Sequence, residues 1–278
     1  MKNKVIKQPI TSNQRPTTVL VTGANGQLGK TIEELYADNQ NNLGFVFVSK
    51  EELDITKAKD LRQFFNNNNF DYCINCAAYT NVEQAEKTPE TAFKVNAEGV
   101  KNLAEVCKEK NVVLIHISTD YVFDGEKNEP YTVDDIPNPI NEYGRSKLLG
   151  EQYVQEILQK YFIIRTSWLY SKKYGNNFYK TILKKVKKGK TFFVTDEQIG
   201  CPTDTASLAL YIISFIEVES TSFGICHFCD EEAMTWYQFA KQILKENNLL
   251  FQMNLIKAKK YFTFAARPKS TILIKKKI

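Results

Sequence analysis

The stretch Val19-Leu-Val-Thr-Gly-Ala-Asn-Gly-Gln-Leu-Gly29 decides the fold of this chain. A short apolar run leads into three glycines, Gly23, Gly26 and Gly29, and an amphipathic segment follows over 27–38. This order predicts a strand, a tight turn and the start of a helix. Such glycines permit the turn, let the backbone approach a pyrophosphate, and let the helix pack on the strand. The helix start would offer free N–H groups to phosphate, so we favour a dinucleotide site over an ordinary glycine turn.

Strand-like and helix-like runs alternate through the first two thirds of the chain. Strands are expected near 18–22, 44–48, 72–76, 112–117 and 162–166. Helices are expected between them, near 27–38, 57–65, 91–110 and 143–160. This alternation is typical of βαβ units, and it predicts an α/β fold with a Rossmann-type, doubly wound parallel sheet covered on both faces.

The order of elements becomes less regular after about residue 170. Amphipathic helices are expected over 177–188, 205–218 and 235–246. We therefore divide the chain into an N-terminal extension, 1–16, a dinucleotide-binding domain, 17–170, and mainly a smaller substrate-binding lobe, 171–278, some of which returns to the first domain. Ligands of open α/β sheets bind beyond the carboxyl ends of the strands, so we place the lobe there.

The composition of the chain indicates which classes of partner to expect. Of its 278 residues, 43% are hydrophobic and 25% are charged, which is ordinary for a globular protein. The net charge of +5 owes much to the runs 184–190 and 275–277, which lack interleaved aromatics, so we expect no nucleic-acid partner. Residues 1–16 lack a signal-peptide core and no apolar run could span a bilayer. We expect a cytoplasmic protein without a membrane partner.

Six cysteines include two Cys-x-x-Cys pairs, Cys73/Cys76 and Cys226/Cys229, the second with His227 alongside. Paired cysteines of this kind can bind zinc. The first pair falls in an expected buried strand, where residues three apart point to opposite faces. We interpret these cysteines as small buried hydrophobic residues in a reducing compartment, and predict no metal site.

A Tyr-x-x-x-Lys pattern marks a candidate proton donor. Tyr143 and Lys147 lie one turn apart at the start of an expected helix and so share a face. A phenol with a pKa near ~10 exchanges protons poorly at neutral pH, and a nearby ammonium is expected to lower that pKa. Tyr237 and Lys241 match the same pattern. We favour the first pair, because it follows the strand-end segment 118–120, and assign the second to packing in the lobe.

A set of segments along nearly the whole chain carries a more specific signal. These are Gly23-Ala-Asn-Gly-Gln-Leu-Gly29, Leu53-Asp-Ile-Thr56, Asn75-Cys-Ala-Ala-Tyr-Thr80, Val82 to Glu86, Ser118-Thr-Asp-Tyr-Val-Phe-Asp-Gly125, Tyr143-Gly-Arg-Ser-Lys147, Arg165-Thr-Ser-Trp168, Gly175-Asn-Asn-Phe178, Asp196 to Thr203 and Ala266-Arg-Pro268. Together and in this order they resemble the extended short-chain dehydrogenase/reductases, and more narrowly the dTDP-4-dehydrorhamnose reductase family. The resemblance implies reduction of the C4 keto group of dTDP-4-dehydro-L-rhamnose to dTDP-L-rhamnose, the last step in making this sugar donor for cell-surface polysaccharide.

The resemblance also implies roles for single residues. Tyr143 would donate a proton to the C4 oxygen, Lys147 would hold the nicotinamide ribose and tune Tyr143, and Thr119 would hydrogen-bond the reacting oxygen. Asp120 would contact the sugar, and Trp168 would line its pocket. The implied cofactor contacts are Gly26, Gln27 and Leu28 at the pyrophosphate, Asp54 and Ile55 at the adenine, and Gly23, Gly29, Ala77, Ala78 and Tyr79 elsewhere along the cofactor.

Structural interpretations of the same residues stay open at this point. They are a turn cap for Thr119 and Asp120, core packing for Trp168, a helix cap for Asp54, packing for Ala77 and Ala78, and a surface charge rather than a diphosphate ligand for Arg267.

The cofactor preference is read from Ser49, Lys50 and Glu51, about 20 residues after the glycine turn. An acid at the end of the second strand typically binds the ribose of NAD. A small polar residue followed by a cation better suits a 2′-phosphate, so we favour NADPH and keep NADH as an alternative. Mg²⁺ rests on the resemblance alone, because no acidic cluster is recognisable from spacing. The oligomeric state stays open, with a homodimer among the alternatives.

Two other functions compete with a reductase. A related nucleotide-sugar epimerase or dehydratase uses the same tyrosine and lysine but keeps its cofactor bound, so stoichiometric consumption of NADPH separates them. A non-catalytic, reductase-like regulatory subunit of the methionine adenosyltransferase type is the third candidate. Intact Thr119, Tyr143 and Lys147 argue against it. The sugar's stereochemistry and the nucleotide base stay open.

Overall fold

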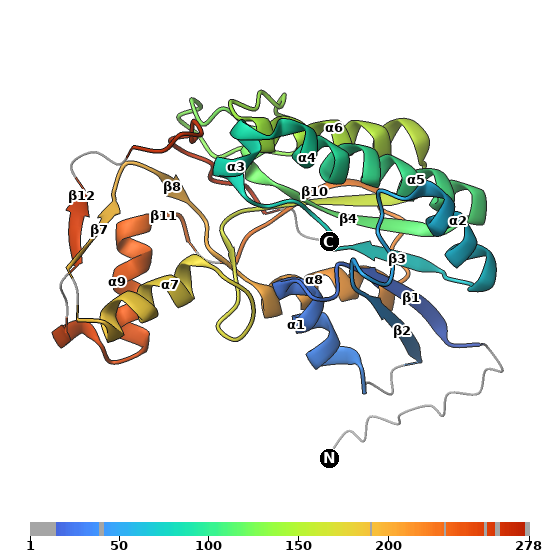
Figure 1. Cartoon of the computed structure of the whole chain (residues 1–278), viewed down its shortest axis with the longest axis horizontal. Coiled ribbons are helices and arrows are strands. Elements are labelled where there is room, and N and C mark those ends of the chain that lie inside the picture. Colours follow the sequence, from blue (N-terminus) through green and yellow to red (C-terminus); the bar gives the residue numbers. More distant parts are fainter. Residues whose placement is uncertain are drawn as a thin grey trace, which may run out of the picture.

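The structure, a computed structural model, describes residues 15–38, 42–189, 191–230, 232–252, 255–258 and 262–275. Its centre is a six-stranded sheet in the order β10-β5-β4-β3-β1-β2, with every pair parallel (Figure 1). The strands are β1 (Thr17–Thr22), β2 (Leu43–Val48), β3 (Tyr72–Asn75), β4 (Val113–Thr119), β5 (Tyr161–Thr166) and β10 (Gly224–Phe228). This order confirms the expected doubly wound α/β fold.

Alternating side chains bury both faces of the sheet. On β1, Leu20 packs into one core with α2 (Ala58–Asn67), α5 (Gly99–Lys110) and α6 (Glu142–Ile157). Val21 points to the opposite core, which α1 (Gln27–Tyr36) and α8 (Thr205–Glu217) cover. The two helical layers lie above and below the sheet in Figure 1. A sheet buried on both faces explains why its strands read as continuous apolar runs.

A smaller region lies beside the sheet, on the left in Figure 1. We call it the lobe: α7 (Phe178–Lys187), β7 (Phe192–Thr195), α9 (Trp236–Glu246) and β12 (Leu255–Ala258). It has its own core, in which side chains of α7 and α9 pack together. Between its two halves the chain returns to the sheet through α8 and β10, so the lobe is built from two separate segments.

Short strands join the lobe to the sheet. β6 (Leu169–Tyr170) pairs with β9 (Thr203–Asp204), and β8 (Ile199–Gly200) pairs with β11 (Met234–Thr235). The first pair leads from the end of β5 toward α7 and later back into α8. These connections hold the lobe over the carboxyl ends of the central strands.

The expected helix over 91–110 forms, but a π-helical turn interrupts its α-helical hydrogen bonding. After α3 (Val82–Lys87), the chain forms α4 (Pro89–Phe93), a π-helical turn (Lys94–Glu98) and then α5. In that turn the buried Asn96 donates to the Tyr79 carbonyl at 2.9 Å and accepts from the Tyr79 N–H at 2.8 Å. A Cβ on Gly150 of α6 would lie 2.1 Å from the Asn96 carbonyl oxygen. The π-helical turn therefore accommodates the close contact with Gly150 and the hydrogen bonds of the buried Asn96 amide. The apolar periodicity of the sequence reveals neither of them.

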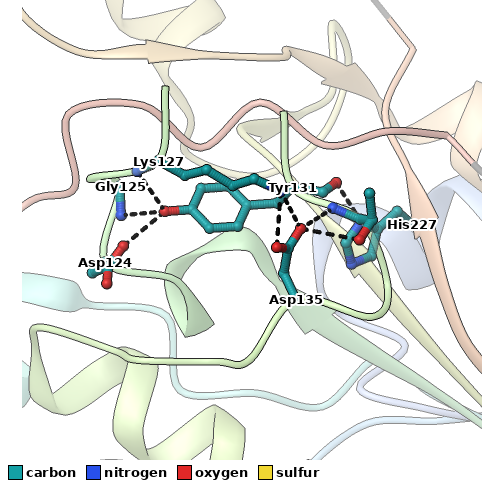
Figure 2. Close-up of polar contacts among 7 residues, drawn as sticks. Asp124, Gly125, Lys127, Tyr131, Asp135 and His227 are labelled. Carbon is teal, nitrogen blue, oxygen red and sulfur yellow. Dashed lines mark hydrogen bonds and ion pairs between the residues drawn. The ribbon is translucent and has the colours of Figure 1, made fainter. Parts of the chain in front are cut away.

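The segment between β4 and α6 is irregular after a 3-10 turn (Asp120–Val122), yet it is tightly held (Figure 2). The Tyr131 hydroxyl donates to Asp124 Oδ1 at 2.7 Å, and Lys127 pairs with Asp135 at 2.7 Å. His227 of β10 contributes Nδ1 at 3.2 Å from the Tyr131 carbonyl oxygen. These contacts fix the path between the end of β4 and the start of α6.

Among the described residues, the six cysteines form no disulfide, and no three His, Cys, Asp or Glu side chains gather as candidate metal ligands. In the same part of the chain, no helix has the length and apolar character needed to cross a bilayer. Parts of the N-terminal extension and of the two lysine runs lie outside the described residues, namely 1–14, 190 and 276–278.

Candidate active site

A cleft of about 610 Å³ opens where the carboxyl ends of the central strands meet the lobe. Nine predicted site residues contribute to its lining: Gly26, Gln27, Leu28, Ala78, Thr119, Asp120, Tyr143, Lys147 and Trp168. Gln27 also ties the glycine turn to the far side, donating to the Leu169 carbonyl at 3.0 Å and accepting from Asn177 Nδ2 at 3.0 Å. The fold thus brings together segments that are more than a hundred residues apart.

Gly23 and Gly29 shape the turn from behind the cleft. Gly23 has a φ of +66°, and a Cβ there would lie 2.6 Å from the backbone nitrogen of Ala77. A Cβ on Gly29 would lie 2.7 Å from Ala24 Cα. Both positions require glycine because backbone meets backbone. These glycines let the turn pack closely against Ala77 and Ala24, and contact of Gly23, Gly29 and Ala77 with a cofactor stays a prediction.

Three further predicted cofactor residues lie outside the lining of the cleft. Asp54 Oδ1 accepts from the Thr56 N–H at 3.0 Å and its hydroxyl at 2.9 Å, which makes it a turn cap. Ile55 is buried against Gly99. Tyr79 is held through its backbone by Asn96. Contact between these three residues and an adenine or a cofactor stays a prediction.

The start of α1 suits a pyrophosphate. Gly26 is the N-cap of α1. Within this part of the described chain, no side chain caps the helix, and its first turn contains no acidic residue. The first backbone N–H groups of a helix have no partner inside it, and the helix dipole favours an anion there. Gly26, Gln27 and Leu28 face the cleft, so these donors fit a phosphate group.

Tyr143 stands at the wall of the cleft beside Thr119. Its hydroxyl shares a hydrogen bond with the Thr119 side chain, and burial raises its pKa above the ordinary value. The net shift is therefore opposite to the one expected from Lys147, because burial dominates. The Lys147 Nζ donates to the Ile117 carbonyl at 2.6 Å instead. A raised pKa keeps the phenol protonated at neutral pH, which is the form that can donate a proton.

Local packing sets Tyr143 against the end of β4. Asn141 caps α6 by accepting from the Gly144 N–H at 2.8 Å, and its amide donates to the Ala266 carbonyl at 2.9 Å. A Cβ on Gly144 would lie 2.2 Å from the Tyr121 carbonyl oxygen, so glycine lets the helix begin there. The first turn of α6 is thereby pressed onto the segment that carries Thr119.

Lys147 is buried one turn further along α6, with 2% of its surface exposed. Burial lowers its pKa to about 8, and the charge of Glu151 acts in the opposite direction. His116 Nε2 lies 3.4 Å from the Lys147 Nζ. Near neutral pH the side chain is thus mainly an ammonium whose charge depends on its neighbours.

Asp120 is held from three sides beneath the cleft. It accepts from Thr119 Oγ1 at 3.1 Å, from Ser167 Oγ at 2.9 Å and from Thr271 Oγ1 at 2.5 Å. Burial raises its pKa to about 6, against the three hydroxyl bonds, which lower it. Sequence reasoning missed Ser167 and Thr271. Ser167 lies within a recognised segment, whereas nothing near Thr271 points to Asp120.

Trp168 stacks on Trp236, with ring centroids 3.5 Å apart and planes 6° apart. Trp168 has a φ of +46°, and a Cβ on Gly200 would lie 2.5 Å from its ring. The Trp236 indole N–H donates to Gln198 Oε1 at 3.0 Å. The pair consists of the only two tryptophans in the chain. Trp236 and Gln198 are contacts that the sequence did not reveal.

A second cavity, of about 560 Å³, adjoins the first on the side of the lobe. The two share Phe178, Trp236 and Arg267 in their linings. Arg267 donates to the Tyr121 hydroxyl at 3.0 Å and to Glu83 Oε1 at 2.7 Å, so it is a fixed cation at the junction rather than a free surface charge. The sequence did not indicate this cavity.

Comparisons with known proteins agree with this geometry. The family model described as the RmlD substrate binding domain matches residues 17–278. A dTDP-4-dehydrorhamnose reductase of Aggregatibacter actinomycetemcomitans is 38% identical, over 92% of this chain and 90% of the relative. A dTDP-4-keto-6-deoxy-D-glucose reductase of Streptomyces niveus is 36% identical, over 81% of this chain and 77% of that one.

A solved structure shows the same architecture. The crystal structure of dTDP-4-dehydrorhamnose reductase from Bacillus anthracis in complex with NADP superimposes with a TM-score of 0.89, at 39% identity, over 94% of this chain and 91% of that chain. The family model covers the glycine turn, the Tyr143 helix and the lobe. This chain belongs to the RmlD family, the dTDP-4-dehydrorhamnose reductases among the extended short-chain dehydrogenase/reductases.

Proposed function

We propose that this protein reduces the C4 keto group of dTDP-4-dehydro-L-rhamnose with NADPH and releases dTDP-L-rhamnose. The observation that carries this proposal is the hydrogen-bonded pair of Tyr143 and Thr119, which faces the cleft between a phosphate-binding helix start and stacked tryptophans. The activity named for the relative from A. actinomycetemcomitans supports the choice of substrate.

The reaction needs a hydride at carbon and a proton at oxygen. When bound, NADPH supplies the hydride. Tyr143 gives its phenolic proton to the C4 oxygen as negative charge develops there. Thr119 turns its hydroxyl proton from Asp120 to the substrate and donates a hydrogen bond to the same oxygen. The ammonium of Lys147 stabilises the phenolate that is left, and solvent returns the proton. The raised pKa of Tyr143 in the protein fits a role as proton donor, because the phenol must be protonated before it acts.

The cofactor contacts follow from charge and shape. The backbone N–H groups of 26–28 would hold the pyrophosphate, and Lys147 would hold the nicotinamide ribose. At the end of β2, the Ser49 N–H donates to Glu52 Oε2 at 2.7 Å, while the Lys50 side chain is exposed. Glu52 is thus turned back onto the chain and Lys50 is available to a 2′-phosphate. This arrangement favours NADPH over NADH, and the NADP in the B. anthracis structure agrees.

The two adjoining cavities suit the two halves of a nucleotide sugar. The sugar would lie in the first cavity, between Tyr143 and Trp168. The diphosphate would pass the guanidinium of Arg267 at the junction. The base would enter the second cavity, whose wall includes the exposed rings of Phe262 and Phe264. Apolar rings around a cavity are typical of sites that bury a flat ligand.

A second candidate is reduction of a different 4-keto-6-deoxy sugar on the same nucleotide. The relative from S. niveus, which carries such an activity in its name, favours keeping it. It shares every chemical step with the first candidate and differs only in the configuration of the sugar ring.

The test mixes purified protein, NADPH and dTDP-4-dehydro-L-rhamnose generated in situ, and follows the absorbance of reduced nicotinamide. We expect one NADPH oxidised per sugar and dTDP-L-rhamnose as the product by NMR. A parallel reaction offers dTDP-4-keto-6-deoxy-D-glucose alone. Faster oxidation with that sugar would select the second candidate, and sugar conversion without NADPH loss would select an epimerase or dehydratase. Cofactor binding with no conversion of either sugar would favour the regulatory alternative.

A further inference from the structure

A buried ion pair lies directly behind the catalytic residues. Glu151 of α6 and Arg165 of β5 are 0% and 1% exposed. The Arg165 Nε donates to Glu151 Oε1 at 3.0 Å, and Nη2 donates to Oε2 at 2.7 Å. This two-pronged arrangement is the strongest geometry available to an arginine and a carboxylate. The proposed mechanism gives neither residue a task.

Ser118 connects this pair to the catalytic strand. Its hydroxyl donates to Glu151 Oε1 at 2.5 Å, and the next residue along β4 is Thr119. The Glu151 carboxylate therefore fastens α6 to β4 through Ser118 and to β5 through Arg165. Those are the elements whose relative placement sets the Thr119–Tyr143 hydrogen bond.

Glu151 also shares a helix face with the catalytic residues. Tyr143, Lys147 and Glu151 follow one another at intervals of four along α6, so their side chains stack on one side of the helix. The carboxylate thus lies one turn from the Lys147 ammonium, which it stabilises electrostatically.

The other groups that face Lys147 do not support its charge in this way. The Asn75 Oδ1 accepts from Thr22 Oγ1 at 2.7 Å and from the Ala77 N–H at 3.2 Å, which fixes the direction of its amide. Asn75 Nδ2 therefore donates to His116 Nδ1 at 3.0 Å, and the His116 proton lies on Nε2, toward Lys147. Burial keeps this imidazole neutral, because its pKa is held well below the ordinary value.

Two remaining neighbours are also neutral near pH 7. Burial raises the pKa of the Cys76 thiol and of the Tyr143 phenol, so neither supplies negative charge. The Ile117 carbonyl contributes only a dipole to Lys147. Glu151 is then the anionic side chain that acts on the ammonium from within α6.

We propose that Glu151 is a positioning residue of the reductase: its carboxylate, fixed by Arg165 and Ser118, keeps Lys147 an ammonium on the Tyr143 face of α6. The proposal rests on the assigned roles of Tyr143 and Lys147. A buried ion pair that served only to hold the fold could be replaced by uncharged side chains without other loss. A pair that also sets the charge of Lys147 could not.

The experiment compares Glu151→Gln with the double variant Glu151→Gln/Arg165→Met. The single variant leaves Arg165 buried without its counter-charge, so it loses stability. The double variant removes both charges, and we expect its thermal midpoint to return close to that of the wild type. The exposed pair of Arg62 and Glu105 supplies the matched control, Glu105→Gln. If the single variant does not fold, the double variant still carries the test.

Two pH profiles, between about pH 6.5 and 9.5, are the decisive readouts. One is kcat/KM with the nucleotide sugar, and the other is the dissociation constant of NADPH, measured by fluorescence. Loss of the Glu151 carboxylate removes a charge that raises the pKa of Lys147. We therefore expect the alkaline limb of both profiles to move down by about one pH unit in Glu151→Gln, to move down by less in the double variant, where the opposing Arg165 charge is also lost, and to stay in place in Glu105→Gln.

Wild-type profiles in Glu151→Gln, or in the double variant if it alone folds, would overturn the proposal, since Glu151 would then only hold the fold. The NADPH profile separates this inference from the proposed function. If the wild type reduced none of the sugars offered, the NADPH profile alone would still show whether Glu151 sets the charge of Lys147. If the wild type reduced the sugar and the variants' profiles coincided with its own, the inference would fail and the function would stand.

Discussion

The catalytic rim and the second cavity are built in opposite ways. At the rim, formed by the end of β4 and the start of α6, the polar groups are buried and paired, as Asp120 and Lys147 show. The second cavity is walled by exposed rings, with Phe262 89% and Phe264 67% exposed. Proton transfer needs atoms fixed to a fraction of an ångström, whereas a binding wall gains its energy when a ligand covers it. In the proposed function, the rim would carry the chemistry and the second cavity would hold part of the substrate.

The supporting structure differs in the same way. The rim belongs to a six-stranded sheet buried on both faces, and its loop is cross-linked through Tyr131. The second cavity rests on the lobe, where β7 and β12 form only a two-stranded sheet. Substitutions at the rim should therefore change turnover, and substitutions around the second cavity should change substrate affinity.

The largest effect is expected for Tyr143→Phe. It removes the proton donor and keeps the ring, so turnover should fall by about 10²–10⁴-fold, while NADPH affinity stays within about twofold. Steady-state rates and a fluorescence titration of NADPH measure the two quantities. Turnover close to that of the wild type would remove Tyr143 from the mechanism and blur the distinction between the two regions.

Lys147→Ala comes next, because it removes a charge that serves both binding and catalysis. We expect kcat to fall by about 10²-fold and the NADPH dissociation constant to rise by about tenfold or more. Lys241→Ala, in the second Tyr-x-x-x-Lys match, is the control and should leave both unchanged. An unaltered NADPH affinity in Lys147→Ala would argue against its contact with the ribose.

Asp120→Asn should separate stability from activity at the rim. The folded pKa of Asp120, about 6, is raised above its ordinary 3.8, so this group's contribution to stability is present below pH 3.8 and lost as pH rises through about 6. Asparagine does not ionise, so the variant does not lose this stability as the pH rises. We expect it to be more stable than the wild type by about 1–3 kcal/mol at pH 7.5, less so at pH 4.5, and slower in turnover.

Thermal or urea unfolding at the two pH values measures this difference. Equal stabilisation at both would mean that Asp120 does not titrate as its burial implies. Lower stability at pH 7.5 would mean that its three hydroxyl bonds outweigh the cost of a buried charge.

Trp236→Leu tests the binding side of the comparison. It removes one half of the tryptophan stack and part of the wall shared by the two cavities. We expect KM for the nucleotide sugar to rise by about tenfold, with kcat within about threefold and NADPH affinity unchanged. A fall in kcat that matched the fall in kcat/KM would show instead that the stack acts in the transition state.

The smallest effect is expected for Lys50→Ala, which removes an exposed charge just after β2. An exposed ion pair contributes at most about 1 kcal/mol, so the preference for NADPH over NADH should drop by about three- to fivefold. Lys57→Ala, exposed on the same stretch, serves as the control. An unchanged ratio of kcat/KM for the two cofactors would place the 2′-phosphate elsewhere.

The sequence predicted five of the six strands of the central sheet, because strand and helix signals alternate there and each signal lies within a few residues. It missed β10, which falls in the part of the chain assigned mainly to the lobe. It also placed Tyr143 and Lys147 one turn apart at the start of a helix, whereas Thr119 was implied by the family resemblance. It missed Thr271 below Asp120, because the two are 151 positions apart and only folding brings them together. It gave the wrong direction for the pKa of Tyr143, since that depends on burial and on Lys147 pointing to a carbonyl instead of the phenol.

The stack of Trp168 on Trp236 could not be predicted for a similar reason. It joins the end of the central sheet to a lobe helix, and nothing in either local sequence specifies the partner. The π-helical turn at 94–98 was missed because a helix with one extra residue in a turn keeps an apolar stripe. Tertiary contacts decided both features.

In the proposed reaction, C4 of a nucleotide-linked sugar receives a hydride at the Tyr143–Thr119 rim. The most direct measurement uses NADPH deuterated at the transferred position, with dTDP-4-dehydro-L-rhamnose as substrate and NMR of the product. Deuterium at C4 of dTDP-L-rhamnose, one atom per NADPH oxidised, is the expected result. Sugar conversion without deuterium in the product, or deuterium at any other carbon, would contradict it.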